Sequence, residues 1–313
     1  MSNCDNMGSY DDMDTYDDMD TYDDMDTYDD MGTYEDMDTY EDKGTCDDKG
    51  TKGMGTKEND VVSSKSSQRK VYVGKQKNIL KLVVDKGELG RGSSGKVHRV
   101  LYKGSKAVMK VGYEEDNIDI FKQEVNAMVK LDGAGGAPKV FAVANDYPMV
   151  VTSLCRGTTL FNWLDNKDIL TKDEVIVVLR KVATKLSEIH GKKFIHNDLK
   201  TDNIIIDKRR DKVKIRIIDF GMVTRPRKKY PGIITPATRS KYPWVAPELT
   251  DFGRTSYASD VFSFGYLTKV MADILEECGV QAHDLADLAR VMMSEAKNDR
   301  PSLAKVIPEL RHL

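Results

Sequence analysis

The chain contains few cysteines, and this scarcity excludes several classes of protein. Cys4, Cys46, Cys155 and Cys278 are the four cysteines among 313 residues; they are widely scattered and form no CxxC pair. A disulfide framework or a zinc site is therefore not expected, and a reducing compartment suits the chain. The N-terminus lacks a basic segment followed by an apolar one, and no run approaches the roughly 20 apolar residues that span a bilayer. We expect a soluble intracellular protein, in the cytoplasm, the nucleus or both, with no membrane partner.

Positive charge is missing from the start of the chain. Residues 1–42 contain 17 Asp or Glu and no Lys or Arg, a net charge of −17. Because the whole chain carries −3, residues 43–313 carry +14. The near-neutral average therefore combines an acidic arm with a basic body. The body is long enough for one domain with a sizeable core, which we expect to have two lobes.

The acidic arm is a repeat with almost no aliphatic residues. Starting at Tyr10, the hexapeptide YDDMDT recurs every six residues and decays after Cys46. Like charges crowd together and little apolar surface can be buried, so chain entropy favours disorder over residues 1–48. The repeat also lacks the glycine turn and the distal bidentate Glu of a tight calcium loop. Residues 49–78, rich in Gly, Ser, Lys and Gln, indicate a linker.

The body begins with a pattern typical of a nucleotide site. Residues 78–112 alternate short β-prone runs with turn residues, which predicts an antiparallel meander. Gly90, Gly92 and Gly95 have the GxGxxG spacing, and glycine lets a backbone approach phosphate oxygens. A dinucleotide fold would need a helix directly after the glycines, but residues 96–102 favour a second strand. Lys110, which lies 15 residues after Gly95, is then placed to reach back to phosphate.

The segments that follow predict a helix, a hairpin and a second helix. Residues 119–131 carry an apolar stripe at helical spacing, and Glu124 beside that stripe is the best candidate partner for Lys110. Residues 139–155 predict two strands around a turn at Asn145–Pro148. A long helix is expected over 172–190, and a strand over 211–221.

Four matched polar groups follow the long helix. Asp198, Lys200 and Asn203 lie in HNDLKTDN (196–203), and Asp219 lies in IIDFG (217–221). One carboxylate can orient a hydroxyl nucleophile and the ammonium can hold a phosphate. An Asn–Asp pair can ligate a hard divalent cation through oxygen. This combination indicates a phosphate-transfer site.

These motifs together resemble the eukaryotic protein kinase family over residues 79–313. GRGSSGKV resembles the glycine-rich loop, AVMK the strand that bears Lys110, and HNDLKTDN the catalytic loop. DFG and APE (246–248) bound an activation segment, while Asp260 and Arg300 match the residue that braces the catalytic loop and the partner of Glu248. The resemblance implies an α+β, two-lobed protein kinase fold, with an N-lobe over 79–153 and a C-lobe over 156–313, preceded by the disordered acidic tail.

The resemblance also implies roles for individual residues. Asp198 would be the catalytic base or orienting group, with Lys200 on the transferring phosphoryl group. Lys110, paired with Glu124, would hold the ATP phosphates, while Asn203 and Asp219 would hold Mg²⁺. Thr152 falls at the gatekeeper position, and Ala107 and Ile205 would sandwich adenine. The full ATP site implied is Leu89, Gly90, Arg91, Gly92, Ser93, Ser94, Gly95, Val97, Ala107, Lys110, Thr152, Ser153, Leu154, Cys155 and Ile205.

Several positions depart from the family pattern. Asn197 replaces the usual Arg before the catalytic Asp, so we expect activity that does not depend on phosphorylation of segment 219–248. Lys200 indicates serine/threonine specificity, whereas Trp244 is typical of tyrosine kinases and of the tyrosine-kinase-like serine/threonine kinases. The two residues together fit the tyrosine-kinase-like serine/threonine group best. Lys241 stands where a Ser or Thr usually packs against the base, so Ser240 could substitute or the loop could be shifted. The region between the helix of Asp260 and a helix at 284–294 is abbreviated.

More than one function is compatible with these motifs. The leading prediction is an ATP-dependent serine/threonine kinase that acts on protein substrates. Small-molecule kinases share the HxD, Asn and Asp core but generally lack the APE ending and the bracing aspartate helix. A pseudokinase or scaffold that acts through the tail, and a dual-specificity kinase, compete with the leading prediction. We expect no specific nucleic-acid partner.

The acidic tail suggests an intramolecular contact. The basic segment 225–229 is compatible with a solvated loop, with a sequence that only mimics a localisation signal, or with a docking strip for acidic substrate. As a docking strip it could bind the tail, which is tethered to it within one chain. Each repeat Thr also has an acidic residue three positions later, as acidophilic kinases favour. The tail is therefore a candidate partner or target of the body.

Overall fold

The computed structural model describes residues 71–92, 95–113, 118–165, 171–210 and 212–313. The predicted tail (1–48), most of the predicted linker (49–78) and the predicted ATP-site residues Ser93 and Ser94 lie outside the described residues.

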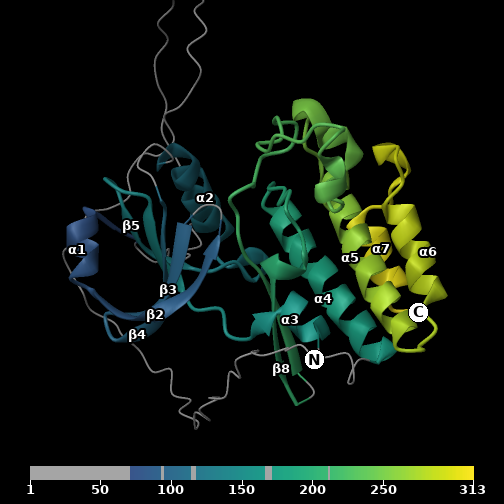
Figure 1. Ribbon diagram of the computed structural model, residues 1–313, viewed down its shortest axis with the longest axis horizontal. Helices are drawn as coiled ribbons and strands as arrows, with labels where there is room; N and C mark the ends of the chain where they lie inside the picture. Colours follow the sequence, from purple (N-terminus) through teal and green to yellow (C-terminus); the bar gives the residue numbers. More distant parts are fainter. Residues whose placement is uncertain (1–70, 93–94, 114–117, 166–170, 211) are drawn as a thin grey trace, which may run out of the picture. The chain divides into compact units, whose positions relative to one another are not determined.

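The N-lobe is built on a six-stranded sheet of order β1-β5-β6-β4-β3-β2 (Figure 1). All neighbouring strands are antiparallel except β1 and β5, which are parallel. The meander predicted over 78–112 is β2–β3–β4, but it begins at Val83, because residues 78–80 belong to helix α1. The predicted turn at Asn145–Pro148 joins β5 to β6. The elements of this lobe are β1 (Tyr72–Gly74), α1 (Gln76–Leu80), β2 (Val83–Gly92), β3 (Gly95–Tyr102), β4 (Ser105–Val111), α2 (Ile118–Leu131), β5 (Val140–Ala144) and β6 (Met149–Ser153).

The regular structure of the N-lobe begins before its predicted start at residue 79. Residues 72–78, assigned to the linker from composition, form strand β1 and part of helix α1. Strand β1 pairs with β5, from Tyr72 opposite Ala142 to Gly74 opposite Ala144. Strand β1 is too short to show a periodic pattern, and its partner β5 is distant along the chain. The local composition therefore indicated a linker.

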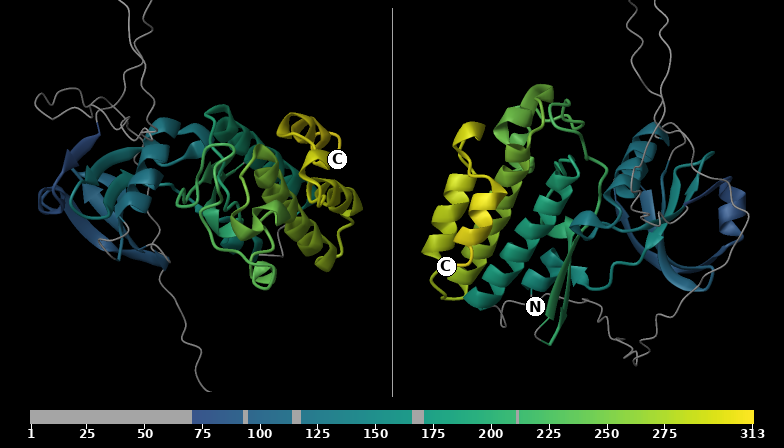
Figure 2. Two further views of the ribbon diagram at one scale, coloured as in Figure 1. Left: turned by 90° about the horizontal axis from the view of Figure 1, so that it is seen from above. Right: turned by 180° about the vertical axis from the view of Figure 1, so that it is seen from behind.

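The C-lobe combines a three-stranded sheet of order β7-β8-β9 with five α-helices among the described residues. In Figure 1 helix α5 lies between α4 and α6, and the view from behind in Figure 2 shows the same order. The elements are β7 (Thr158–Thr159), α3 (Leu160–Asp165), α4 (Lys172–Gly191), β8 (Ile204–Arg209), β9 (Lys212–Ile217), α5 (Tyr257–Glu277), α6 (His283–Met292) and α7 (Leu303–Glu309), with short 3-10 turns at η4 (Thr201–Asn203), η5 (Arg239–Lys241), η6 (Pro247–Phe252) and η7 (Lys297–Asp299). A further 3-10 turn, η2 (Ala134–Gly136), lies between α2 and β5.

Helix α4 shows why its sequence forms a long amphipathic helix. The Thr171 side chain accepts the backbone N–H of Glu174 at 3.3 Å, which caps the first turn. Acidic residues in that turn complement the positive end of the helix dipole. The apolar positions follow helical spacing and are buried: Val175, Ile176, Val178, Leu179, Val182, Ala183, Leu186 and Ile189. The helix ends at Gly191, shortly before the predicted catalytic loop.

Helix α5 runs through the centre of the C-lobe core. Its apolar residues are buried on several sides, as in a helix surrounded by other elements. A Cβ on Gly265 would lie 2.8 Å from the Met292 Cβ, so glycine permits the close approach of α5 and α6. Residues 278–282 are all that separates the two helices, which agrees with the expected abbreviated connection.

The largest core cluster extends from α2 through α4 and α5 to α7, and a second cluster fills the N-lobe sheet around Ile79 and Val100. The predicted α+β, two-lobed fold is confirmed. No helix in the described part of the chain has the length and apolar character needed to cross a bilayer.

Candidate active site

The loop between α4 and β8 holds Asp198 with donors from its own sequence. The side-chain amide of Asn203 donates to both the Asp198 backbone carbonyl and Oδ2, each at 2.8 Å. The Lys200 ammonium lies 3.0 Å from the same Oδ2. These three residues, adjacent in the predicted motif, therefore also meet in space.

Asp260 on α5 holds the backbone of this loop through hydrogen bonds. Its carboxylate is fully buried and accepts the backbone N–H of His196 and of Asn197, each at 2.8 Å. The ring nitrogen Nε2 of His190 lies 2.8 Å from Asp260 Oδ2. A buried carboxylate is expensive unless it is fully hydrogen-bonded, and these contacts satisfy it. The expected bracing contact is present.

Lys110 and Glu124 form the predicted ion pair. Both Glu124 oxygens lie 2.8 Å from Lys110 Nζ, and Asp219 Oδ1 lies 4.0 Å from the same nitrogen. Burial raises the pKa of Glu124 above its usual range, and the attraction of Lys110 opposes that rise. Because Lys110 is on β4 and Asp219 follows β9, this cluster links residues of the two lobes.

The glycine-rich segment is the β2–β3 hairpin. A Cβ on Gly90 or Gly92 would meet nothing within 4 Å, so a ligand could approach this backbone closely. Gly95 differs, because its φ is +146° and a Cβ would lie 2.2 Å from the Val111 carbonyl oxygen. Packing against β4 therefore explains Gly95, while open space at Gly90 and Gly92 fits the predicted phosphate contact.

The other predicted ATP residues lie on several elements. Ala107 is buried on β4 opposite Ser153 of β6, and Thr152 is buried beside it. Ile205 lies on β8, in the C-lobe sheet. Burial raises the pKa of the Cys155 thiol, so this cysteine is poorly ionised. The remaining positions are Leu89 and Arg91 on β2, Val97 on β3, and Leu154 directly after β6; the adenine contact itself stays a prediction.

Asn197 makes hydrogen bonds that the sequence did not reveal. It is 1% exposed, and its amide nitrogen donates to the Met222 carbonyl at 2.7 Å and to Thr224 Oγ1 at 2.9 Å. The Oγ1 atoms of Thr224 and Thr255 are 2.8 Å apart, which joins the activation segment to the chain before α5. We call Asn197, Thr224 and Thr255 the amide clamp.

Trp244 is a second residue whose contact sequence reasoning missed. Its indole Nε1–H donates to Asp198 Oδ1 at 2.7 Å. Among the described residues, neither Ser240 nor Lys241 makes a hydrogen bond to Asp198, so Trp244 supplies the donor from this part of the activation segment. The only sequence signal was its position two residues before Ala246.

The end of the activation segment is tied to the C-lobe. Arg300 donates to both carboxylate oxygens of Glu248, each at 2.8 Å, which is a bidentate pair. It also donates to the Ala258 carbonyl at 3.0 Å. The expected pair is therefore formed, with further anchorage to the start of α5.

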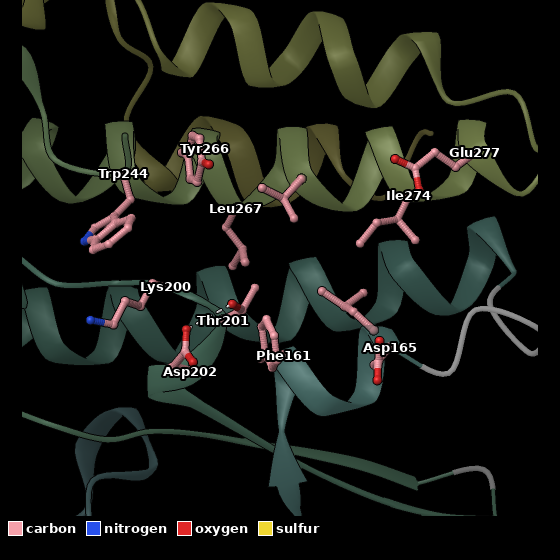
Figure 3. Close-up of a pocket in the computed structure, with 12 residues that line it drawn as sticks. Phe161, Asp165, Lys200, Thr201, Asp202, Trp244, Tyr266, Leu267, Ile274 and Glu277 are labelled. Carbon is pink, nitrogen blue, oxygen red and sulfur yellow. Dashed lines mark hydrogen bonds between the residues drawn. The ribbon is translucent and has the colours of Figure 1, made fainter. Parts of the chain in front are cut away.

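A cavity of about 380 Å³ adjoins the catalytic loop (Figure 3). Lys200 and Trp244 lie at one end and Asp165 at the other, with α5 along one side. Its lining is Phe161, Leu164, Asp165, Lys200, Thr201, Asp202, Trp244, Tyr266, Leu267, Val270, Ile274 and Glu277.

The donor set proposed for Mg²⁺ fits that ion. Asn203 turns its amide nitrogen toward Asp198, which leaves its carbonyl oxygen to face elsewhere, and the Asp219 side chain is 45% exposed. Mg²⁺ commonly uses one or two protein oxygens and completes its shell with water and phosphate. Within the described residues, no group of three or more His, Cys, Asp or Glu side chains could hold a metal ion. In that part of the chain, no site of this kind is an alternative to Asn203 and Asp219.

Comparison with known families identifies the class. Residues 83–312 match the protein kinase domain, and the chain belongs to that family.

The most similar proteins include kinases of both hydroxyl specificities. The serine/threonine-protein kinase SBK1 of Danio rerio is 31% identical over 210 residues, which cover 61% of this chain and 52% of the relative. The death-associated protein kinase dapk-1 of Caenorhabditis elegans is 26% identical over 200 residues, 59% of this chain and 14% of the relative. The human cytoplasmic tyrosine-protein kinase BMX is 28% identical over 251 residues, 79% of this chain and 35% of the relative. The matched region thus spans about half of the first relative's length and less of the other two.

Proposed function

We propose that the protein is an ATP-dependent protein kinase that transfers the γ-phosphate of ATP to Ser or Thr hydroxyls of protein substrates. The observation that carries this proposal is the group in which Asp198 accepts a hydrogen bond from Asn203 and forms an ion pair with Lys200. In this proposal the substrate oxygen attacks the γ-phosphorus, the bond to the β–γ bridging oxygen breaks and ADP leaves. The hydroxyl proton passes to the Asp198 carboxylate.

The remaining groups of the site have supporting roles in the proposal. Lys110 would hold the ATP phosphates with its position fixed by Glu124, and Lys200 would neutralise charge on the transferring group. Asn203 and Asp219 would hold Mg²⁺, which neutralises phosphate charge when bound. Lys200 also favours Ser/Thr over Tyr, although relatives of both kinds match the chain.

Exchanging Asp198 for Asn tests the proposal. With Mg²⁺, ATP and a generic protein substrate, Asp198→Asn should lower turnover by about 10²- to 10⁴-fold, the contribution of a positioned acid–base group. Asp287→Asn, which changes a carboxylate on the surface of α6, is the matched control and should retain activity. If wild type and Asp198→Asn were equally inactive, a pseudokinase or scaffold function would take precedence.

We infer further that activity does not depend on phosphorylation of segment 219–248. The amide clamp supports this inference, because Asn197 holds the segment with neutral hydrogen bonds where an Arg would need a phosphate to pair with. The backbones of Ile195 and Thr224 add two bonds, at 2.9 and 3.0 Å.

The acidic tail is the proposed intramolecular partner of the domain. Arg225 is used internally, since its guanidinium lies 3.8 Å from the Phe194 ring centroid and donates to the Lys192 carbonyl. Arg227, Lys228 and Lys229, here named the basic strip, are exposed. Opposite charge on the tail and tethering within one chain support their contact. An intracellular location, in the cytoplasm or nucleus, is proposed from the scattered cysteines.

A further inference from the structure

Donors occupy both oxygens of the Asp198 carboxylate. Oδ2 accepts Asn203 Nδ2 at 2.8 Å and lies 3.0 Å from Lys200 Nζ, while Oδ1 accepts Trp244 Nε1 at 2.7 Å. An ionised carboxylate offers about four acceptor positions, two on each oxygen. Oδ2 therefore carries a hydrogen bond and an ion pair, whereas Oδ1 carries one hydrogen bond and keeps a further acceptor position. Oδ1 is thus the oxygen better placed to accept a substrate hydroxyl.

Trp244 determines where the remaining position points. Asn203 and Lys200 both contact Oδ2, but the torsion about the Cβ–Cγ bond of an Asp is intrinsically broad. The indole N–H on Oδ1 is a second anchor on the other oxygen and narrows that torsion. The Asp198 side chain is 16% exposed, so this charge-assisted hydrogen bond is only weakly competed by water.

The indole is itself held in place. The Lys200 ammonium lies 5.0 Å from the Trp244 ring centroid, within range of a cation–π interaction. The Tyr242 ring packs edge-on, with centroids 5.9 Å apart. In Figure 3 the nitrogen atoms of Trp244 and Lys200 lie at the same end of the cavity. Lys200 thus contacts both the carboxylate and the ring that positions it.

We propose that Trp244 is a positioning residue for phosphoryl transfer: its indole N–H orients the Asp198 carboxylate so that the free acceptor on Oδ1 receives the substrate hydroxyl. This inference rests on the proposed function. A ring that only filled space would not need its N–H directed at the carboxylate. The position of Nε1 therefore distinguishes a positioning role from a packing role.

Trp244→Phe tests the kinetic consequence, because it keeps an aromatic ring and removes the N–H. We expect kcat to fall about 10- to 100-fold, as for a lost hydrogen bond to a charged group. The KM for ATP, the melting temperature and the stabilisation by ATP should stay as in wild type. Trp163→Phe on α3 changes the second tryptophan and should retain kcat. An unchanged kcat in Trp244→Phe, or a change confined to the KM for the protein substrate, would overturn the proposal.

Fluorescence tests the contact without requiring activity. In Trp163→Phe the sole tryptophan is Trp244, and adding Asp198→Asn should shift its emission maximum because the charged acceptor is lost. Adding Asp165→Asn, at the far end of the cavity, is the matched control and should leave the emission unchanged. If Asp198→Asn leaves the emission maximum unchanged, the inference is overturned, even when the protein is inactive. If the emission maximum shifts but the protein is inactive, only the proposed function is contradicted.

Discussion

At the scale of single residues, Glu124 shows a conflict between stability and function. Its carboxylate is 5% exposed, and burial raises its pKa despite the adjacent Lys110. A raised pKa means that the folded state disfavours the ionised form relative to the unfolded state. The cost is absent below the usual pKa of Glu and develops as pH rises through the raised value. The part of Glu124 in function is therefore expected to be its contact with Lys110 rather than a contribution to stability.

Glu124→Gln should separate the two effects. Turnover should fall at least tenfold, because Lys110 loses its ionic partner. The melting temperature of the variant relative to wild type should rise as pH increases above the usual Glu pKa of about 4, since Gln lacks the ionisation cost that wild type then acquires. Thermal melting and ATP turnover of both proteins measure this. A relative melting temperature that falls with pH would contradict the assignment.

Residues of the site differ in how far the sequence predicts them. Asp198, Lys200 and Asn203 are close along the chain, so a local motif predicts that they meet. Trp244 lies 46 residues from Asp198, and its contact depends on how the activation segment folds back. Asn197 could be recognised as unusual, but its partners on that segment could not, because they are set by tertiary packing rather than by spacing.

At the scale of elements, the amide clamp connects three segments. Thr224 receives the Asn197 amide and contacts Thr255, so it links the catalytic loop to the start of α5. Thr255 donates also to the Lys228 carbonyl at 3.2 Å. The clamp therefore orders the first part of the activation segment through uncharged groups.

Thr224→Val, nearly equal in volume, should weaken the clamp. Turnover should fall roughly 5- to 30-fold, equivalent to one or two kcal/mol of lost hydrogen bonding. The comparison is Thr235→Ala/Thr238→Ala/Ser240→Ala, which removes hydroxyls that phosphorylation could use and should retain most turnover. Loss of nearly all turnover in the triple variant would contradict independence from phosphorylation.

Helices and strands were predictable where their own periodicity was strong. The apolar positions of α4 and the alternation in β2–β4 are local, and both elements formed where expected. Strand β1 was missed, because three residues are too few to show a period and its partner β5 is distant in sequence.

At the scale of the whole molecule, opposite charges lie on separate parts of the chain. The first 42 residues carry −17 and the remainder carries +14. The exposed basic strip carries part of this positive charge and lies within the activation segment. Attraction between exposed charges is screened beyond about 10 Å at 0.1 M salt and about 3 Å at 1 M.

Deleting residues 1–60 should therefore lower the KM for a protein substrate at low salt and have little effect at high salt. Arg227→Glu/Lys228→Glu/Lys229→Glu in the full chain should produce the same low-salt change, because it removes the basic half of the attraction. Steady-state kinetics across a salt series and the phosphorylation state of the chain provide the measurement. Deletion without effect on rate, affinity or phosphorylation would exclude a role for the tail in this contact.

Strand β1 also sets a limit on how the chain can be shortened. It occupies the outer position beside β5, so its removal would turn β5 into an edge strand with a row of unsatisfied N–H and C=O groups. Such an edge recruits other chains, and the protein would become prone to self-association. In a variant that begins at residue 79, effects of losing the tail could not be separated from effects of aggregation. A variant that begins before Tyr72 keeps β5 paired with β1.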